Sequence, residues 1–111
     1  MEQEKNEVLK GTLDMLILKV LALGPNHGYG ISQRLQQISR DFFQVPEGSL
    51  YPALYRLEDR GWLQAKWEET ETGREAKFYA LTRGGRKHLS AQVDSWERLS
   101  EAVALILSAA E

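Results

Sequence analysis

The spacing of apolar residues predicts a first helix that has little polar surface. From Leu9 to Leu23 the apolar positions recur every three or four residues and also spread around most of the helical circumference. A helix that is apolar on nearly all sides is buried on nearly all sides. We therefore expect one side to pack on its own domain and the other side, through Leu13 and Ile17, to meet a second chain.

Two shorter helices follow a break at the sequence GPNHGYG. In the second helix, from about 28 to 39, and the third, from about 47 to 60, apolar residues recur at i, i+4 and i+7. The third helix ends at Gly61, a residue suited to a helix C-terminus. Two strands are predicted next, at Leu63–Glu69 and Lys77–Thr82, joined by a loop that contains a glycine.

The order of elements predicts a fold that is mainly α with a small β hairpin. Three short helices followed by a hairpin are the layout of a winged helix-turn-helix, in which the third helix is the recognition helix and the hairpin is the wing. We assign residues 1–82 to a winged helix DNA-binding domain, with the wing at about 63–82. Residues 83–111 form a long C-terminal helix that we expect to mediate dimerisation.

The outward face of the third helix differs from a plain solvated surface. A helical wheel places Gly48, Pro52, Tyr55, Arg56 and Asp59 there, with Ser49 and Tyr51 at its edges. Hydroxyls and arginine contact phosphates and base edges, and small residues allow close approach. The alternative is that Tyr51 packs sideways on the core and Tyr55 is ordinary surface.

Further candidates come from outside this helix. Tyr29, between two glycines, either fills the core or places its hydroxyl on a phosphate near a helix N-terminus. On the hairpin, Arg74 and Lys77 could meet the DNA backbone, although Glu75 leaves a merely solvated hairpin as the alternative. The candidate DNA-binding residues are Tyr29, Ser49, Tyr51, Pro52, Tyr55, Arg56, Arg74 and Lys77.

The last helix carries a heptad-like seam. Leu89, Val93, Trp96, Ser100, Val103 and Leu107 are spaced 4, 3, 4, 3 and 4 residues apart. Either this stripe covers its own domain, or it forms a homodimer interface, which we favour because a small domain leaves it little to cover. Trp96 would lie near its own copy across a two-fold axis, so the two rings either form a packed core or leave a slot for a flat aromatic ligand.

Composition restricts the classes of function. The formal net charge is −2 and the pI about 5.7, which counts against nucleic-acid binding, although residues 28–87 hold two more basic than acidic residues. The absence of cysteine removes disulfides and thiolate chemistry. His27 and His88 lack metal-ligand spacing and no catalytic constellation is present, so we expect no cofactor, no metal and no enzyme activity. Without a signal-peptide pattern or a membrane-spanning stretch, we expect a cytoplasmic protein.

Three motifs carry a family resemblance. LYPALYRLEDRGWL (Leu50–Leu63), preceded by HGYGI (His27–Ile31) and followed by KFYALTRGGR (Lys77–Arg86), resembles the PadR family of bacterial transcriptional regulators. The likeness extends from about Lys10 to about Leu107, and the short chain is similar to members with a single C-terminal helix. Glu75 and Ala76 depart from the more basic wing tip of many members.

The resemblance implies a homodimer that represses transcription by binding a two-fold symmetric double-stranded DNA operator. Some relatives in the family bind planar or phenolic effectors at the dimer centre. The resemblance therefore also implies that Trp96 is a ligand-binding residue for a small aromatic effector. The alternative function is a winged-helix protein–protein interaction module without DNA binding, which the acidic pI would suit.

Overall fold

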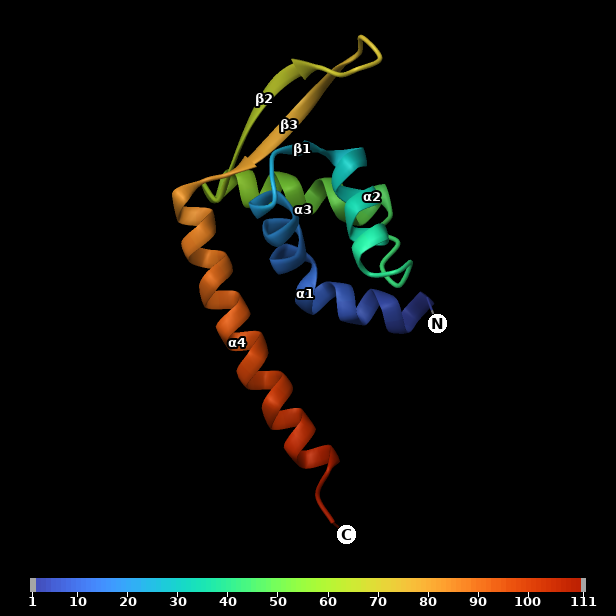
Figure 1. Ribbon diagram of the computed structural model, residues 1–111, viewed down its shortest axis with the longest axis vertical. Helices are drawn as coiled ribbons and strands as arrows, with labels where there is room; N and C mark the ends of the chain where they lie inside the picture. Colours follow the sequence, from blue (N-terminus) through green and yellow to red (C-terminus); the bar gives the residue numbers. More distant parts are fainter. Residues whose placement is uncertain (1, 111) are drawn as a thin grey trace.

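The described residues form four helices and a small antiparallel sheet (Figure 1). The computed structural model describes the backbone of residues 2–110 and the side chains of residues 12–110. The elements in chain order are α1 (Glu2–Ala22), β1 (Asn26–His27), α2 (Gly28–Ile38), α3 (Glu47–Asp59), β2 (Leu63–Glu69), β3 (Glu75–Leu81) and α4 (Arg83–Leu107). This mainly helical fold with a β hairpin confirms the predicted winged helix-turn-helix architecture.

The hairpin belongs to a three-stranded sheet whose strand order is β1-β3-β2. β2 and β3 pair antiparallel from Leu63↔Leu81 to Glu69↔Glu75. The short strand β1, which lies in the segment that we expected to be only a break, pairs with β3 at Asn26↔Tyr79 and His27↔Phe78. The sequence did not reveal β1 because two residues are too few to show any alternation of apolar and polar positions.

The core is built around α1. Ile17 and Leu18 are fully buried, and α2, α3, β3 and α4 all pack against this helix. Leu13 and Ile17, which we expected to face a second chain, instead lie in the core of their own domain, because the surrounding elements occupy nearly the whole circumference of α1. Because the domain is small, each neighbouring helix lies close enough to pack against one side of α1.

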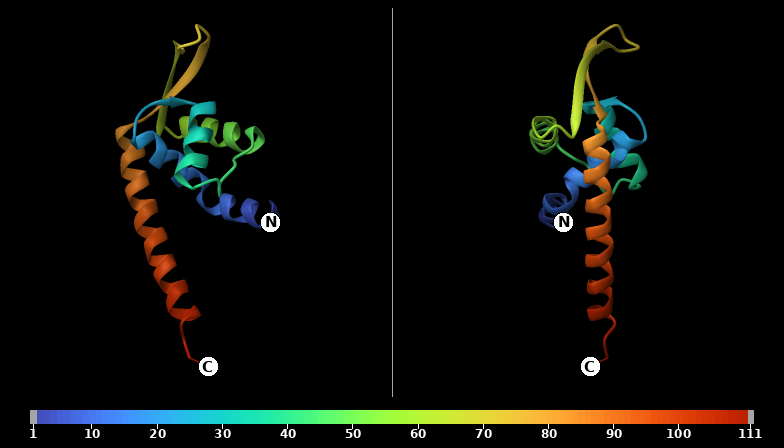
Figure 2. Two further views of the ribbon diagram at one scale, coloured as in Figure 1. Left: turned by 45° about the vertical axis from the view of Figure 1, so that its right-hand side comes forward. Right: turned by 90° about the vertical axis from the view of Figure 1, so that its left-hand side faces the viewer.

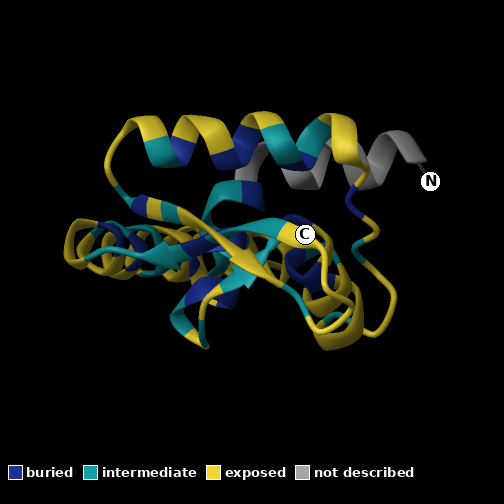
Figure 3. Ribbon diagram, turned by 90° about the horizontal axis from the view of Figure 1, so that it is seen from above, coloured by how far each residue is buried: buried dark blue, intermediate teal, exposed yellow. Residues whose placement is uncertain are grey.

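The helix α3, which the sequence predicts to be the recognition helix, is amphipathic in the predicted sense. Leu50, Ala53, Leu54 and Leu57 are buried, whereas the opposite face is exposed. Figure 3 shows this division as a dark inner side and a yellow outer side along the helix. Pro52 lies inside α3, within the first turns, where the loss of its backbone donor is tolerated best.

The helix α4 is attached to the domain at its N-terminus and then leaves it (Figures 1 and 2). Thr82 caps α4, because its Oγ1 accepts a hydrogen bond from the Gly85 N–H at 3.0 Å and donates one to the Gly61 carbonyl at 2.8 Å. The rings of Trp62 and His88 stack with their centroids 3.5 Å apart. Leu89 is buried in the domain core, so the first part of the predicted seam covers its own chain.

Gly85 allows this close attachment, and its replacement tests it. A Cβ at Gly85 would clash with the Trp62 carbonyl oxygen and lie 2.6 Å from Leu81 Cδ1, whereas a Cβ at Gly84 would meet nothing closer than 3.8 Å. We expect Gly85→Ala to lower the free energy of unfolding by about 2 kcal/mol through overpacking. Gly84→Ala, the matched control, should be neutral or stabilising by up to about 1 kcal/mol, because alanine favours helix. Urea unfolding monitored by circular dichroism measures both; equal effects would contradict the close contact.

Candidate nucleic-acid interface

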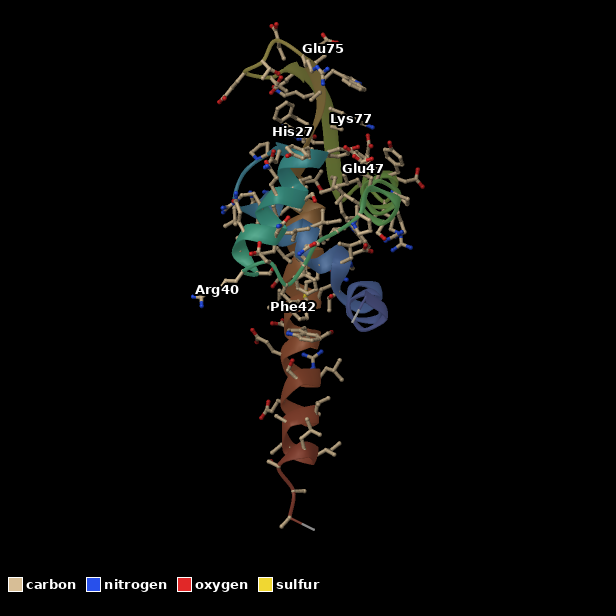
Figure 4. All side chains as sticks on the ribbon, turned by 90° about the vertical axis from the view of Figure 1, so that its right-hand side faces the viewer. His27, Arg40, Phe42, Glu47, Glu75 and Lys77 are labelled. Atoms are coloured by element: carbon tan, nitrogen blue, oxygen red, sulfur yellow. The ribbon has the colours of Figure 1, made fainter. Side chains whose placement is uncertain are left out.

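A groove separates the wing from α2 and α3. Its volume is about 1160 Å³, and its walls come from the start of α2, one side of α3 and both wing strands. Figure 4 shows His27 at the start of α2 beneath the wing, and Lys77 on the wing on the side of α3. The groove is lined by polar, aromatic, basic and acidic residues, including Tyr29, Gln33, Arg34, Gln37, Tyr51, Tyr55, Trp67, Glu69, Glu71, Arg74, Glu75 and Lys77.

The outward face of α3 borders this groove. Gly48, Pro52, Tyr55 and Arg56 are exposed, and Ser49 is half-buried, in agreement with the wheel. The exposed ring of Tyr55 lies beneath Lys77, whose Nζ is 5.5 Å from the ring centroid. The face therefore presents small groups, a hydroxyl and an aromatic ring in a row.

The structure separates the roles of Tyr29 and Tyr51. Tyr29 is 67% exposed, so it does not fill the core, and its hydroxyl accepts a hydrogen bond from Gln33 Nε2 at 3.2 Å. Tyr51 is half-buried against α2, and a Cβ at Gly28 would lie 2.6 Å from its hydroxyl oxygen. Gly28 therefore makes room for the Tyr51 ring, and sideways packing, the alternative weighed for Tyr51, describes its position.

Arg56 forms an ion pair with α1. Its Nη2 lies 2.6 Å from Asp14 Oδ1, and the side chain keeps 46% of its surface exposed. The guanidinium thus points toward α1 and still reaches solvent at the edge of the outward face. Asp14 was not a candidate in the sequence, because nothing in the spacing connects positions 42 residues apart.

Lys77 forms an ion pair with α3. Its Nζ lies 2.9 Å from Glu58 Oε1, and this hydrogen bond raises the pKa of Lys77 above its ordinary value. The ammonium also lies 5.4 Å from the ring centroid of Tyr79, a buried tyrosine whose pKa is raised mainly by burial. Lys77 is therefore placed on the wing opposite Trp67 and above α3, and its charge is partnered.

The outer part of the wing has a mixed charge and one large exposed aromatic ring. Arg74 is exposed near the turn, and Glu69, Glu71 and Glu75 line the same groove. Figure 4 shows Glu75 near the far end of the hairpin. Trp67, which sequence reasoning did not select, is 66% exposed and lines the groove. The sequence signal that could have identified Trp67 is a large aromatic residue within a strand of the predicted hairpin.

The second half of α4 exposes an apolar stripe. Trp96, Leu99, Val103, Ile106 and Leu107 are all exposed, and Leu107 is 80% exposed. Val93 is partly buried against the domain core and Ser100 is half-buried, so the change from covered to uncovered surface occurs near the middle of the helix. No described part of the chain covers the stripe beyond that point.

A hollow of about 380 Å³ lies where α4 leaves α1. It is lined by Met15, His88, Ala91, Gln92, Ser95, Trp96 and Leu99. Gln92 Oε1 is buried and has no hydrogen-bond partner within the described residues. The hollow therefore combines an exposed indole ring with an unsatisfied acceptor.

Among the described residues, no group of three or more histidine, aspartate or glutamate side chains could hold a metal ion. No helix in the described part is long and apolar enough to cross a membrane.

Comparison with known proteins identifies the family. The model of the transcriptional regulator PadR-like family matches residues 17–91, which include the last part of α1, the groove and the start of α4. The chain belongs to the PadR-like family of transcriptional regulators. It is therefore a regulator and not an enzyme.

Two curated relatives of this PadR-like protein are similar to it over most of both chains, and solved structures share its fold. A transcriptional regulator of Mycobacterium tuberculosis is 32% identical over 97 residues, which are 87% of each chain. An uncharacterised Lysinibacillus sphaericus protein is 29% identical over 96% of this chain and 98% of its own. The PadR-like regulator of Bacillus cereus has a TM-score of 0.81 at 29% identity and matches 94% of this chain and 99% of its own. The PadR family regulator of Eggerthella lenta has a TM-score of 0.84 at 28% identity and matches 98% of this chain and 93% of its own.

Proposed function

We propose that this PadR-like regulator binds double-stranded DNA as a homodimer and represses transcription. The observation that carries the DNA-binding proposal is the exposed outward face of α3 beside the groove under the wing. α3 would enter the major groove, where Ser49, Pro52 and Tyr55 meet base edges and phosphates. The groove lining holds three basic and three acidic residues, so it is less acidic than the whole chain, whose formal net charge is −2.

Contacts from α2 and the wing would fix the register of α3 on DNA. Tyr29 at the start of α2 and Arg34 further along this helix line the groove, where they could reach the sugar-phosphate backbone. Arg74 is the exposed cation of the outer wing, and Trp67 offers an apolar surface beside it. Arg56 and Lys77 lie at the border of the interface with their charges already paired.

The homodimer would form through the second half of α4. Trp96, Val103 and Leu107 of the predicted seam are exposed, and their neighbours Leu99 and Ile106 widen the stripe. An exposed apolar stripe of this length on a soluble regulator is typical of an oligomer interface. Two copies related by a two-fold axis would present two α3 helices to half-sites about 34 Å apart on a symmetric operator.

A planar or phenolic effector would bind in the hollow beside Trp96. The indole ring offers a stacking surface, and a phenolic hydroxyl could donate a hydrogen bond to the unpartnered Gln92 Oε1. The hollow lies between α1 and the proposed dimer helix, so an occupant could change the angle between α4 and the domain. An effector releases DNA only if it binds one dimer shape more tightly than the other.

The DNA-binding face is tested by alanine substitution. We expect Tyr55→Ala to weaken binding to a duplex enriched from a random-sequence pool by about 1–3 kcal/mol. Arg56→Ala, which removes the ion-pair partner of Asp14 at the border of the face, should also weaken this binding. Arg98→Ala, which removes an exposed cation from the projecting part of α4, is the control and should leave affinity unchanged. Fluorescence anisotropy at several salt concentrations measures binding, and log K should fall linearly with log salt. Salt-independent association with a protein partner and none with DNA would instead support an interaction module.

The dimer interface is tested by placing a charge on the stripe. Val103→Glu would bury an unpaired carboxylate at the two-fold interface and so cost about 3–5 kcal/mol of dimer stability. We expect a monomer at micromolar concentration in sedimentation analysis. Leu105→Glu, two residues further and on the opposite side of α4, is the control and should remain dimeric. An unchanged dimer in the Val103 variant would place the interface elsewhere.

The effector site is tested by tryptophan fluorescence. We expect at least one member of a panel of planar cationic and phenolic compounds to quench the emission of Trp96 and to weaken DNA binding. Trp96→Phe removes this signal and leaves the background from Trp62 and Trp67. If no compound changes the Trp96-dependent emission or the DNA affinity, the two Trp96 rings form only a packed dimer core.

A further inference from the structure

The two cations nearest the outward face of α3 are each held by a carboxylate on a different element. Arg56 on α3 pairs with Asp14 on α1, with Nη2 and Oδ1 2.6 Å apart. Lys77 on β3 pairs with Glu58 on α3, with Nζ and Oε1 2.9 Å apart. Near its C-terminal end, α3 is therefore connected by charge to the helix below it and to the wing above it.

We propose that Asp14–Arg56 and Glu58–Lys77 are positioning ion pairs, which fix the recognition helix between α1 and the wing so that both copies of α3 meet the operator in register. This proposal rests on the DNA binding proposed above. It assigns a role in recognition to Asp14 and Glu58, two acidic residues that would otherwise only repel phosphate.

The geometry favours positioning over direct contact. For Arg56 to bind a phosphate, it would have to leave a carboxylate of similar charge, which reduces the net electrostatic gain, and Asp14 would then be left unpaired near the DNA. Lys77 is restricted further, because it lies over the rings of both Tyr55 and Tyr79. Holding Lys77 in this place also orients Tyr55, which belongs to the proposed reading face.

The pairs also connect α3 to the proposed dimer helix. Asp14 is adjacent to Met15, which lines the hollow between α1 and α4. A fixed relation between α1 and α3 therefore transmits the placement of α4 to the recognition helix. Since recognition sites tolerate displacements of only about 0.5 Å, a loose connection here would reduce specific binding more than non-specific binding.

Removal of the carboxylate alone separates the two roles of Arg56. If Arg56 contacts DNA directly, Asp14→Asn frees its guanidinium and strengthens binding. If Arg56 positions α3, Asp14→Asn weakens specific binding even though the protein becomes less negative. The matched control is Asp59→Asn, since Asp59 is exposed on the same helix and forms no ion pair within the described residues.

The experiment measures two affinities for each variant by fluorescence anisotropy. One probe is a duplex enriched by the parent protein from a random-sequence pool, and the other is a scrambled duplex of the same composition. We expect Asp14→Asn and Glu58→Gln each to weaken binding to the enriched duplex about fivefold and to leave binding to the scrambled duplex equal or tighter. Asp59→Asn should tighten both by similar factors. If Asp14→Asn and Glu58→Gln behave like Asp59→Asn, the positioning role is overturned.

A reversed pair provides a second measurement that general destabilisation would not reproduce. Asp14→Arg combined with Arg56→Asp should restore at least part of the ratio of enriched to scrambled affinity, because it restores the link between α1 and α3. If Arg56 reads DNA directly, the reversed pair stays as weak as Arg56→Asp alone, and the proposal fails. Circular dichroism at the assay temperature confirms that each variant is folded. If the parent protein enriches no sequence, the DNA-binding proposal itself fails, and this inference falls with it.

Discussion

The burial of α1 is the constraint on which the rest of the structure depends. Ile17 and Leu18 are fully buried, and three helices and a strand of the sheet pack around them. A small domain buries little surface, so one shared central helix supplies most of its apolar contacts. The same arrangement fixes α3 and α4 relative to each other, because both use α1 as their support.

The long helix α4 has two environments along one continuous stripe. Its first turns are fixed by the Thr82 cap, the contact of Gly85 with Trp62 and the stacking of His88 on Trp62. Leu89 completes the domain core, whereas Val103 and Leu107 project away from it. A single seam can therefore serve the domain at one end and a second subunit at the other. The hollow beside Trp96 lies at the point where these two functions meet.

Local charge, and not net charge, decides how a protein of this composition can approach DNA. The chain is formally acidic, and the outer wing carries three glutamates around Arg74. The groove is lined by Arg34, Arg74 and Lys77 together with an equal number of glutamates, and two carboxylates near α3 are paired with Arg56 and Lys77. The two ion pairs reduce the repulsion between these carboxylates and the phosphates of the proposed DNA partner. The hydroxyls and rings of α3 then remain free to face that DNA.

The sequence alone determined the order of the elements and the two faces of α3. Periodic leucines, Gly61 and the hairpin glycine are local signals, and a helix or hairpin depends largely on local spacing. The family motifs in the sequence also predicted the fold and the class of regulator. The same local signals located the seam on α4, although they could not show where along it the domain ends.

Only the tertiary structure decided which surfaces remain free. It placed Leu13 and Ile17 inside the domain, exposed Tyr29, packed Tyr51 against Gly28 and added β1 to the sheet. It also joined Asp14 to Arg56 and Glu58 to Lys77 across 42 and 19 residues of sequence. Burial and ion pairing depend on which elements meet in space, and periodicity along one segment carries no information about its neighbours.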